Sequence, residues 1–131
     1  MMQKINPEWL PAPRGYNHGL VATPGGKLVF VAGQIGWDKF GKMTEGLVNQ
    51  FHRALQNVME VVKAAGGMPE TIAQMTIYIK DKKEYLEQQK ALGPVWRTVM
   101  GKHYPPMSLV VVQDLLEDKA LVEIEAIAVI G

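Results

Sequence analysis

Two nearly continuous apolar runs near the end of the chain, residues 107–112 and 121–130, constrain the fold more than any other feature. Short runs rich in valine and isoleucine are typical of buried β-strands. Glu123 and Glu125 interrupt the second run, and a buried carboxylate without a partner strongly destabilises a fold. We therefore expect each of these side chains either to face water or to be held by a specific partner.

Three further strands are predicted earlier in the chain. Residues 16–23 and 27–33 have the composition of strands, and Pro24-Gly25-Gly26 lies between them. Glycine supplies the positive φ that a tight turn needs, so these two strands are expected to form a hairpin. A weaker alternation of apolar residues predicts another strand over residues 71–80.

Two amphipathic helices are predicted between the strands. Apolar residues recur at three- and four-residue steps from Leu47 to Ala65, with Thr44 as the expected N-cap and Gly66-Gly67 as the expected end. A second helix is predicted over about residues 82–100. Gly93-Pro94 lies inside it, and we expect a kink or a break there because proline lacks the backbone donor.

The order of these elements predicts an α+β domain and an oligomer. Two helical crossovers between strands favour a mixed sheet with both helices on one face. Residues 28–32 and 109–112 are apolar on both alternating faces, so both sides of the sheet need burial. Two helices cover only one side, which predicts a homo-oligomer that packs sheet against sheet.

Composition excludes several classes of protein. The 131 residues suit one domain, residues 1–131, and the formal net charge of +1 provides no basic stripe for nucleic acid. The chain has no cysteine, which excludes disulfides and thiolate metal sites. Residues 1–13 do not resemble a signal peptide, and no run reaches the roughly 18 apolar residues of a membrane span. We therefore expect a soluble, cytoplasmic protein that binds no nucleic acid and no membrane.

Familiar catalytic motifs are missing from the sequence. The three histidines lack the spacing of a zinc site, and Ser108, the only serine, does not lie in a GxSxG motif. Residues 36–42 mimic most of a phosphate-binding loop. Met43 follows where a hydroxyl is needed to bind magnesium, so this segment is interpreted as a turn that contains a lysine.

Five segments in order resemble one family over almost the full length. They are Tyr16-Asn17-His18, residues 28–35, Ala64-Ala65-Gly66-Gly67, residues 76–81 and residues 122–128. Together they look like the Rid family, also called YjgF or L-PSP proteins.

The resemblance implies a fold, an assembly and a chemistry. The implied fold is chorismate-mutase-like, with a mixed six-stranded sheet and two helices on one face. The implied assembly is a homotrimer with a central β-barrel and a pocket at each subunit interface. Deaminase members of the family hydrolyse reactive enamines and imines to a keto acid and ammonia without a cofactor, so the expected ligand is a small-molecule metabolite.

The resemblance also assigns roles to individual residues. The water-handling carboxylate corresponds to Glu123, an aromatic hydroxyl at the pocket edge to Tyr16, and a backbone contact with substrate to Gly33. Glu125, two residues after Glu123 on the same strand face, is equally compatible with a pair across a subunit interface.

The chain departs from the family pattern at the expected substrate-binding positions. Met107 stands where the family has its substrate-binding arginine, and loss of a bidentate clamp is expected to cost several kcal/mol of binding. Leu109 stands where deaminase members often have cysteine, Ala32 replaces a usual serine, and Gln89 stands about where an asparagine is expected. The pocket is therefore predicted to be more apolar.

Other cations are candidates for the missing positive charge. They are Arg14, Arg97, Lys102 and His103, although surface solvation is the simpler explanation for a lone basic residue. Three functions then stay open. The first is a divergent imine or enamine deaminase, the second is a non-catalytic trimer that binds a small ligand or a partner protein, and the least favoured is an endoribonuclease or translation inhibitor.

Overall fold

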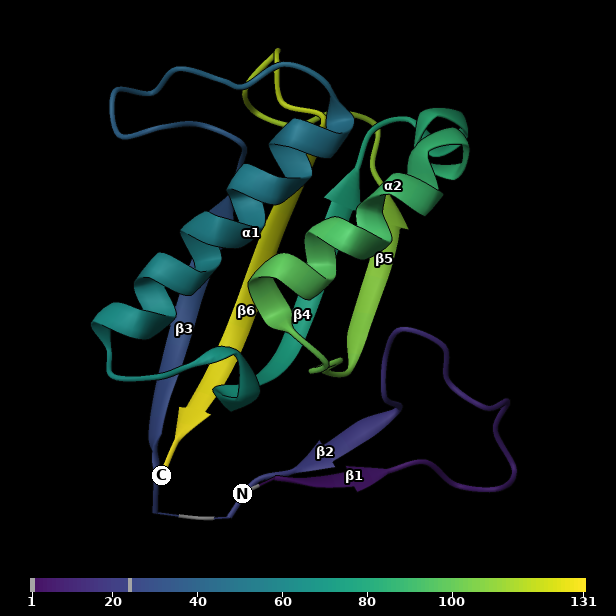
Figure 1. The fold of residues 1–131 in the computed structure, drawn as a ribbon, viewed down its shortest axis with the longest axis vertical. Helices are drawn as coiled ribbons and strands as arrows, with labels where there is room; N and C mark the ends of the chain where they lie inside the picture. The colour runs from purple at the N-terminus through teal and green to yellow at the C-terminus, as the bar shows by residue number, and fades with distance from the viewer. Residues whose placement is uncertain (1, 24) are drawn as a thin grey trace.

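The computed structural model describes residues 2–23 and 25–131, and Figure 1 shows their arrangement. The elements in chain order are β1 (Gln3–Ile5), β2 (Gly19–Val21), β3 (Lys27–Gln34), α1 (Leu47–Ala64), the short 3-10 helix η1 (Pro69–Thr71), β4 (Ile72–Ile79), α2 (Lys82–Met100), β5 (Met107–Val111) and β6 (Val122–Ile130). The predicted strands 71–80, 107–112 and 121–130 and both predicted helices are confirmed to within about two residues at their ends.

Four strands form the main sheet, in the order β3-β6-β4-β5. β6 is antiparallel to both of its neighbours, and β4 is parallel to β5. β3 and β4 therefore run in the same direction, and α1 and α2 are the two predicted crossovers between parallel strands. Figure 1 shows both helices on the same side of this mixed sheet, as predicted.

One prediction about the sheet is wrong. The main sheet has four strands and not six, because β1 and β2 form a separate two-stranded antiparallel sheet. The last two strands of the chain are not neighbours, since β4 lies between β5 and β6. Glu123 on β6 and Met107 on β5 are thus separated by a whole strand.

The predicted hairpin between residues 16–23 and 27–33 is also wrong. β2 is only three residues long and pairs with β1, while β3 pairs with β6. The reason lies just before β2: the Asn17 amide group donates to the backbone oxygen of Tyr104, and the His18 backbone N–H donates to the Asn6 side chain. These distant partners hold the segment away from β3. Pro24 in the expected turn lies outside the described residues.

The ends of the helices follow local chemistry. After α1, the Gly67 N–H bonds the Val62 carbonyl and the Gly66 N–H bonds the Lys63 carbonyl, with Gly66 at φ +94°. This pair of bonds confirms the predicted glycine end. Thr44 is not the N-cap: Gly46 takes that position, and the Thr44 hydroxyl donates to the Gly36 carbonyl instead.

α2 continues through Pro94, so of the predicted kink or break the structure excludes the break. Its N-terminus is capped by Asp81, whose carboxylate accepts from the Glu84 backbone N–H at 3.1 Å. Its buried face contributes Leu92, Trp96 and Met100 to the core beneath the helices. No helix in residues 2–23 and 25–131 has the length and apolar character that a membrane span requires.

The other face of the sheet has no helix over it. Along β6, residues 122, 124, 126 and 128 are buried beneath the helices, and the alternate residues point to the opposite side. On that open face Leu28 keeps 60% and Phe30 keeps 70% of its surface exposed. The predicted uncovered apolar face is therefore present in the chain.

Candidate functional site

Glu123 lies on the open face of the sheet, directly over Gly33. β6 carries Glu123, and Gly33 lies in the part of β3, between Val31 and Gln34, where the pairing with β6 shifts register. A methyl group added at Gly33 would overlap the Glu123 carboxylate. Gly33 is thus needed to leave room for a carboxylate, a contact that the spacing of the sequence does not reveal.

The second carboxylate of β6 is held by a partner within the chain. The Tyr78 hydroxyl donates a hydrogen bond to Glu125. This bond is the main reason why the pKa of Tyr78 is raised above its usual 10, with smaller contributions from burial and from the negative charges of Glu125 and Glu123. No hydrogen bond to the Glu123 side chain is found in the described part of the chain. Glu123 is therefore the carboxylate that is free to handle a ligand or a water.

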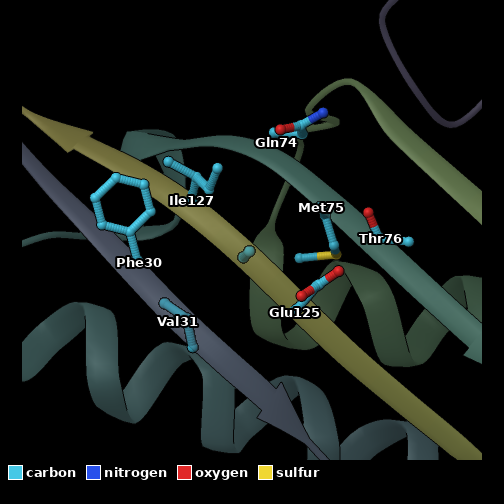
Figure 2. A pocket seen from close by; sticks show the side chains of 8 residues that line it. Phe30, Val31, Gln74, Met75, Thr76, Glu125 and Ile127 are labelled. Carbon is cyan, nitrogen blue, oxygen red and sulfur yellow. The ribbon is translucent and has the colours of Figure 1, made fainter.

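The open face also has a shallow hollow of about 200 Å³ beside Glu125. Figure 2 shows Phe30 and Ile127 together at one side of it, and Thr76 and Glu125 at the other. Each of these is a cross-strand pair, Phe30 with Ile127 and Thr76 with Glu125. The face is thus apolar toward β3 and polar toward β4.

A larger cavity of about 400 Å³ lies between the N-terminal segment, α2 and β5. It is lined by four residues that the sequence nominated for substrate binding, Tyr16, Gln89, Met107 and Leu109. Met107 pairs with Met75 and Leu109 with Ile77 in the parallel ladder, and both partners are buried beneath the helices. The two side chains therefore point toward the helix-covered side and into the cavity.

Hydrogen bonds and stacking hold one wall of this cavity. The Trp96 indole donates to the His103 carbonyl at 3.0 Å, and its ring stacks on Tyr104 with 5.8 Å between centroids and 8° between planes. Asn17, which is buried, donates to the Tyr104 carbonyl and so fixes the adjacent Tyr16 beside the cavity. The sequence offered Trp96 as a residue that either lines a pocket or packs in the core, but it did not reveal Tyr104 as its stacking partner, because the stacking depends on a loop that follows α2.

One of the four candidate cations lines the cavity. All of Arg14, Arg97 and Lys102 are exposed, but only Arg14 lines the cavity, so it lies at its rim. The His103 ring is already in hydrogen-bonding contact with the Ile72 carbonyl at 2.7 Å. Arg14 is therefore the one candidate whose position fits the missing cation.

Tyr85 adds a neutral hydroxyl to the same cavity. Burial is the main cause that raises the pKa of Tyr85 above 10, and a hydrogen bond with Gln89 acts in the opposite direction. The phenol therefore stays uncharged at neutral pH. The cavity thus combines apolar walls with neutral polar groups and one cation at its rim.

The segment that mimics a phosphate-binding loop is a turn, as predicted. One oxygen of Asp38 accepts from the backbone N–H groups of Phe40 and Lys42, both at 2.9 Å. The bond from Lys42 is the main cause that lowers the pKa of Asp38 below its usual value. The backbone donors of this loop thus bind the chain's own carboxylate.

Similarity to known proteins supports the resemblance seen in the sequence. Residues 9–130 match the family described as Endoribonuclease L-PSP. The chain belongs to this family. It is 34% identical over 118 residues to the RutC family protein UK114 of Drosophila melanogaster, which covers 88% of this chain and 80% of the relative. The match to 2-iminobutanoate/2-iminopropanoate deaminase of Salmonella typhimurium is 34% over 105 residues, 79% of this chain and 80% of the relative.

A solved structure of the family shares the fold. The Rid protein YyfB from Yersinia pestis superimposes with a TM-score of 0.86 at 27% identity, and the match covers 98% of each chain. The predicted membership of the Rid, YjgF or L-PSP family is therefore confirmed, and so is the mixed α+β fold with two helices.

Within one chain, the nominated site residues form two separate groups. Glu123 and Gly33 lie on the open face, while Tyr16, Met107 and Leu109 lie at the cavity on the helix-covered side. We call the first group the carboxylate half and the cavity the aromatic half. Because a sheet separates them, one copy of the chain does not bring Glu123 to the ligand cavity.

Proposed function

We propose that this Rid-family protein is a homo-oligomer, a trimer, that hydrolyses reactive imines or enamines at sites shared between subunits. The observation that supports this most strongly is the division of the candidate site into a carboxylate half and an aromatic half on opposite faces of one sheet. A cyclic assembly gives each copy two different contact surfaces, so it can bring the carboxylate half of one copy to the aromatic half of the next.

The open face supports association. It combines exposed Leu28 and Phe30 with no covering helix. Burying a large apolar side chain contributes about 1.5–3 kcal/mol, and each copy contributes several such side chains to a sheet-on-sheet contact. Association also moves Glu123 into a drier environment, where an electrostatic contact with a substrate is stronger.

Glu123 is the proposed general base. It takes a proton from water as the water oxygen bonds to the imine carbon, and the electron pair of the C=N bond moves to nitrogen, which receives that proton. The resulting carbinolamine then forms C=O, passes its hydroxyl proton to nitrogen and breaks the C–N bond. The products are a carbonyl compound and ammonia. Support for the reaction type comes from the deaminase of Salmonella typhimurium among the relatives.

The test is an assay on imines made in the reaction mixture. Amino-acid oxidation or dehydration supplies 2-iminobutanoate, 2-aminoacrylate and larger imino acids, and release of the keto acid is followed. The wild type is expected to accelerate release, and Glu123→Gln to lose about a hundredfold or more of the acceleration. Glu125→Gln is the matched control on the same strand face. A wild type that accelerates none of these imines, or an unimpaired Glu123→Gln, would contradict the proposal.

A non-catalytic binding protein is the second candidate, and Met107 is the observation that favours it. The thioether of Met107, which lines the cavity, does not pair with a substrate carboxylate. In that case the wild type is inert in the imine assay, and Met107→Arg is expected to gain activity on the small imino acids.

A further inference from the structure

The aromatic half carries a charge at only one place. Its aromatic side chains are Tyr16, Phe51, Tyr85, Trp96 and Tyr104. Arg14 is its one charged lining side chain, and no ion pair of Arg14 is found among residues 2–23 and 25–131. A ligand with one negative charge and an apolar body therefore matches this cavity in only one orientation.

The strand side of the cavity offers no donor to the charged end. Ile77, Met107 and Leu109 line the β4 and β5 side, and a carboxylate placed against them would lose water without gaining a hydrogen-bond donor. The guanidinium of Arg14 on the rim offers a planar pair of donors that matches a carboxylate. The charged end of the ligand thus belongs at the rim and its apolar body inside.

The shape of the aromatic wall favours an aromatic ring as the apolar part of the ligand. Trp96 and Tyr104 are nearly parallel, and each is fixed by a bond from elsewhere in the chain. Fixed aromatic faces bind another ring at little cost in side-chain entropy. A volume of about 400 Å³ lies in the range of cavities that bind small molecules of one or two rings.

We propose that this cavity binds aromatic monocarboxylates, with the ring against the aromatic wall and the carboxylate paired with Arg14. Applied to catalysis, and resting there on the proposed function, the substrates are 2-imino acids with aromatic side chains. Arg14 then supplies, from the N-terminal segment, the cation that Met107 does not.

Binding of three stable compounds to the intact protein tests this directly by calorimetry. The probes are 3-phenylpropanoate, its amide 3-phenylpropanamide, and propanoate. The wild type is expected to bind 3-phenylpropanoate at least about tenfold more tightly than propanoate, because only the former buries a ring. Arg14→Gln is expected to weaken the binding of 3-phenylpropanoate about tenfold and to leave the binding of the amide unchanged. Arg97→Gln removes an exposed arginine of α2 and is the matched control.

Two results would overturn the inference. One is equal affinity for propanoate and 3-phenylpropanoate, which would show that the wall does not recognise a ring. The other is an Arg14→Gln protein that binds 3-phenylpropanoate like the wild type. Binding is measured without turnover, so an inert protein that binds as expected would refute the proposed deaminase and leave this inference standing. An active enzyme that lacks this binding preference would refute this inference and leave the proposed deaminase standing.

Discussion

The two faces of the main sheet differ in what they offer a ligand. The open face presents Glu123 and Glu125 among exposed apolar side chains, and within residues 2–23 and 25–131 only Glu125 has a hydrogen-bond partner. The helix-covered side, next to β5, presents an aromatic cavity with an arginine on its rim and no carboxylate among its described lining residues. The candidate carboxylate and the candidate ligand cavity are therefore separate surfaces of one chain, and in the proposed function association joins them into one site.

The largest effect is expected from a substitution that disturbs the carboxylate half and leaves the Glu123 residue itself unchanged. In Gly33→Ala the new methyl group occupies the place of the Glu123 carboxylate, which must rotate away. Imine hydrolysis is expected to fall about a hundredfold, the contribution of a positioned general base, while thermal unfolding changes little because the displaced group is the end of a flexible side chain. Gly19→Ala is the control, since a methyl group there meets only ordinary contacts, at 3.6 Å and beyond. Undiminished hydrolysis in Gly33→Ala would refute the role given to this contact.

A smaller effect is expected from a change that weakens association. Phe30→Lys places a charge on the open face, where the proposed oligomer buries the ring at a gain of about 1.5–3 kcal/mol per copy. Light scattering should then show dissociation at concentrations where the wild type stays assembled. Phe40→Lys alters an aromatic residue that is 84% exposed in the turn before α1, and should leave the assembly intact. If Phe30→Lys has the same molar mass as the wild type at every concentration, the open face is not the interface.

The smallest effect is expected when Glu125 loses its hydrogen-bond partner, the feature that distinguishes it from Glu123. Tyr78→Phe removes the bond to Glu125 and should lower the free energy of unfolding slightly. The folded state raises the pKa of Tyr78, so this bond stabilises the fold below pH 10 and its contribution is lost as pH rises through the folded-state pKa. Thermal unfolding followed from pH 8 upward should therefore show a loss above pH 10 that is larger in the wild type than in Tyr78→Phe. If the stability of the wild type and of Tyr78→Phe depended on pH in the same way, the stabilising role of this bond would be contradicted.

Elements with a strong local pattern could be predicted from the sequence. The stripe of α1 and the glycine pair after it depend on near neighbours, and so does the alternation that placed Glu123 and Glu125 on one face. The predicted hairpin is absent because the Asn17 side chain bonds the backbone of Tyr104, which is 87 residues away. No local pattern contains that contact.

The candidate site could be nominated residue by residue, but its arrangement could not. The resemblance identified Tyr16, Gly33, Met107 and Glu123, and the structure places two of them on each side of the sheet. That division follows from the register of β5 and β6 on β4, which places Met107 and Glu123 on opposite faces, and register is a property of long-range pairing. The role of Gly33 likewise requires the contact between two strands far apart in sequence.

A mixture of two inactive variants tests the shared site most directly. Glu123→Gln removes the carboxylate half, and Leu109→Trp fills the aromatic half, so each protein alone should be folded, assembled and inactive. If each site joins halves from two copies, oligomers co-assembled from equal amounts should recover roughly a quarter of the wild-type rate, because one site in four pairs two intact halves. A mixture as inactive as the separate variants would contradict the account.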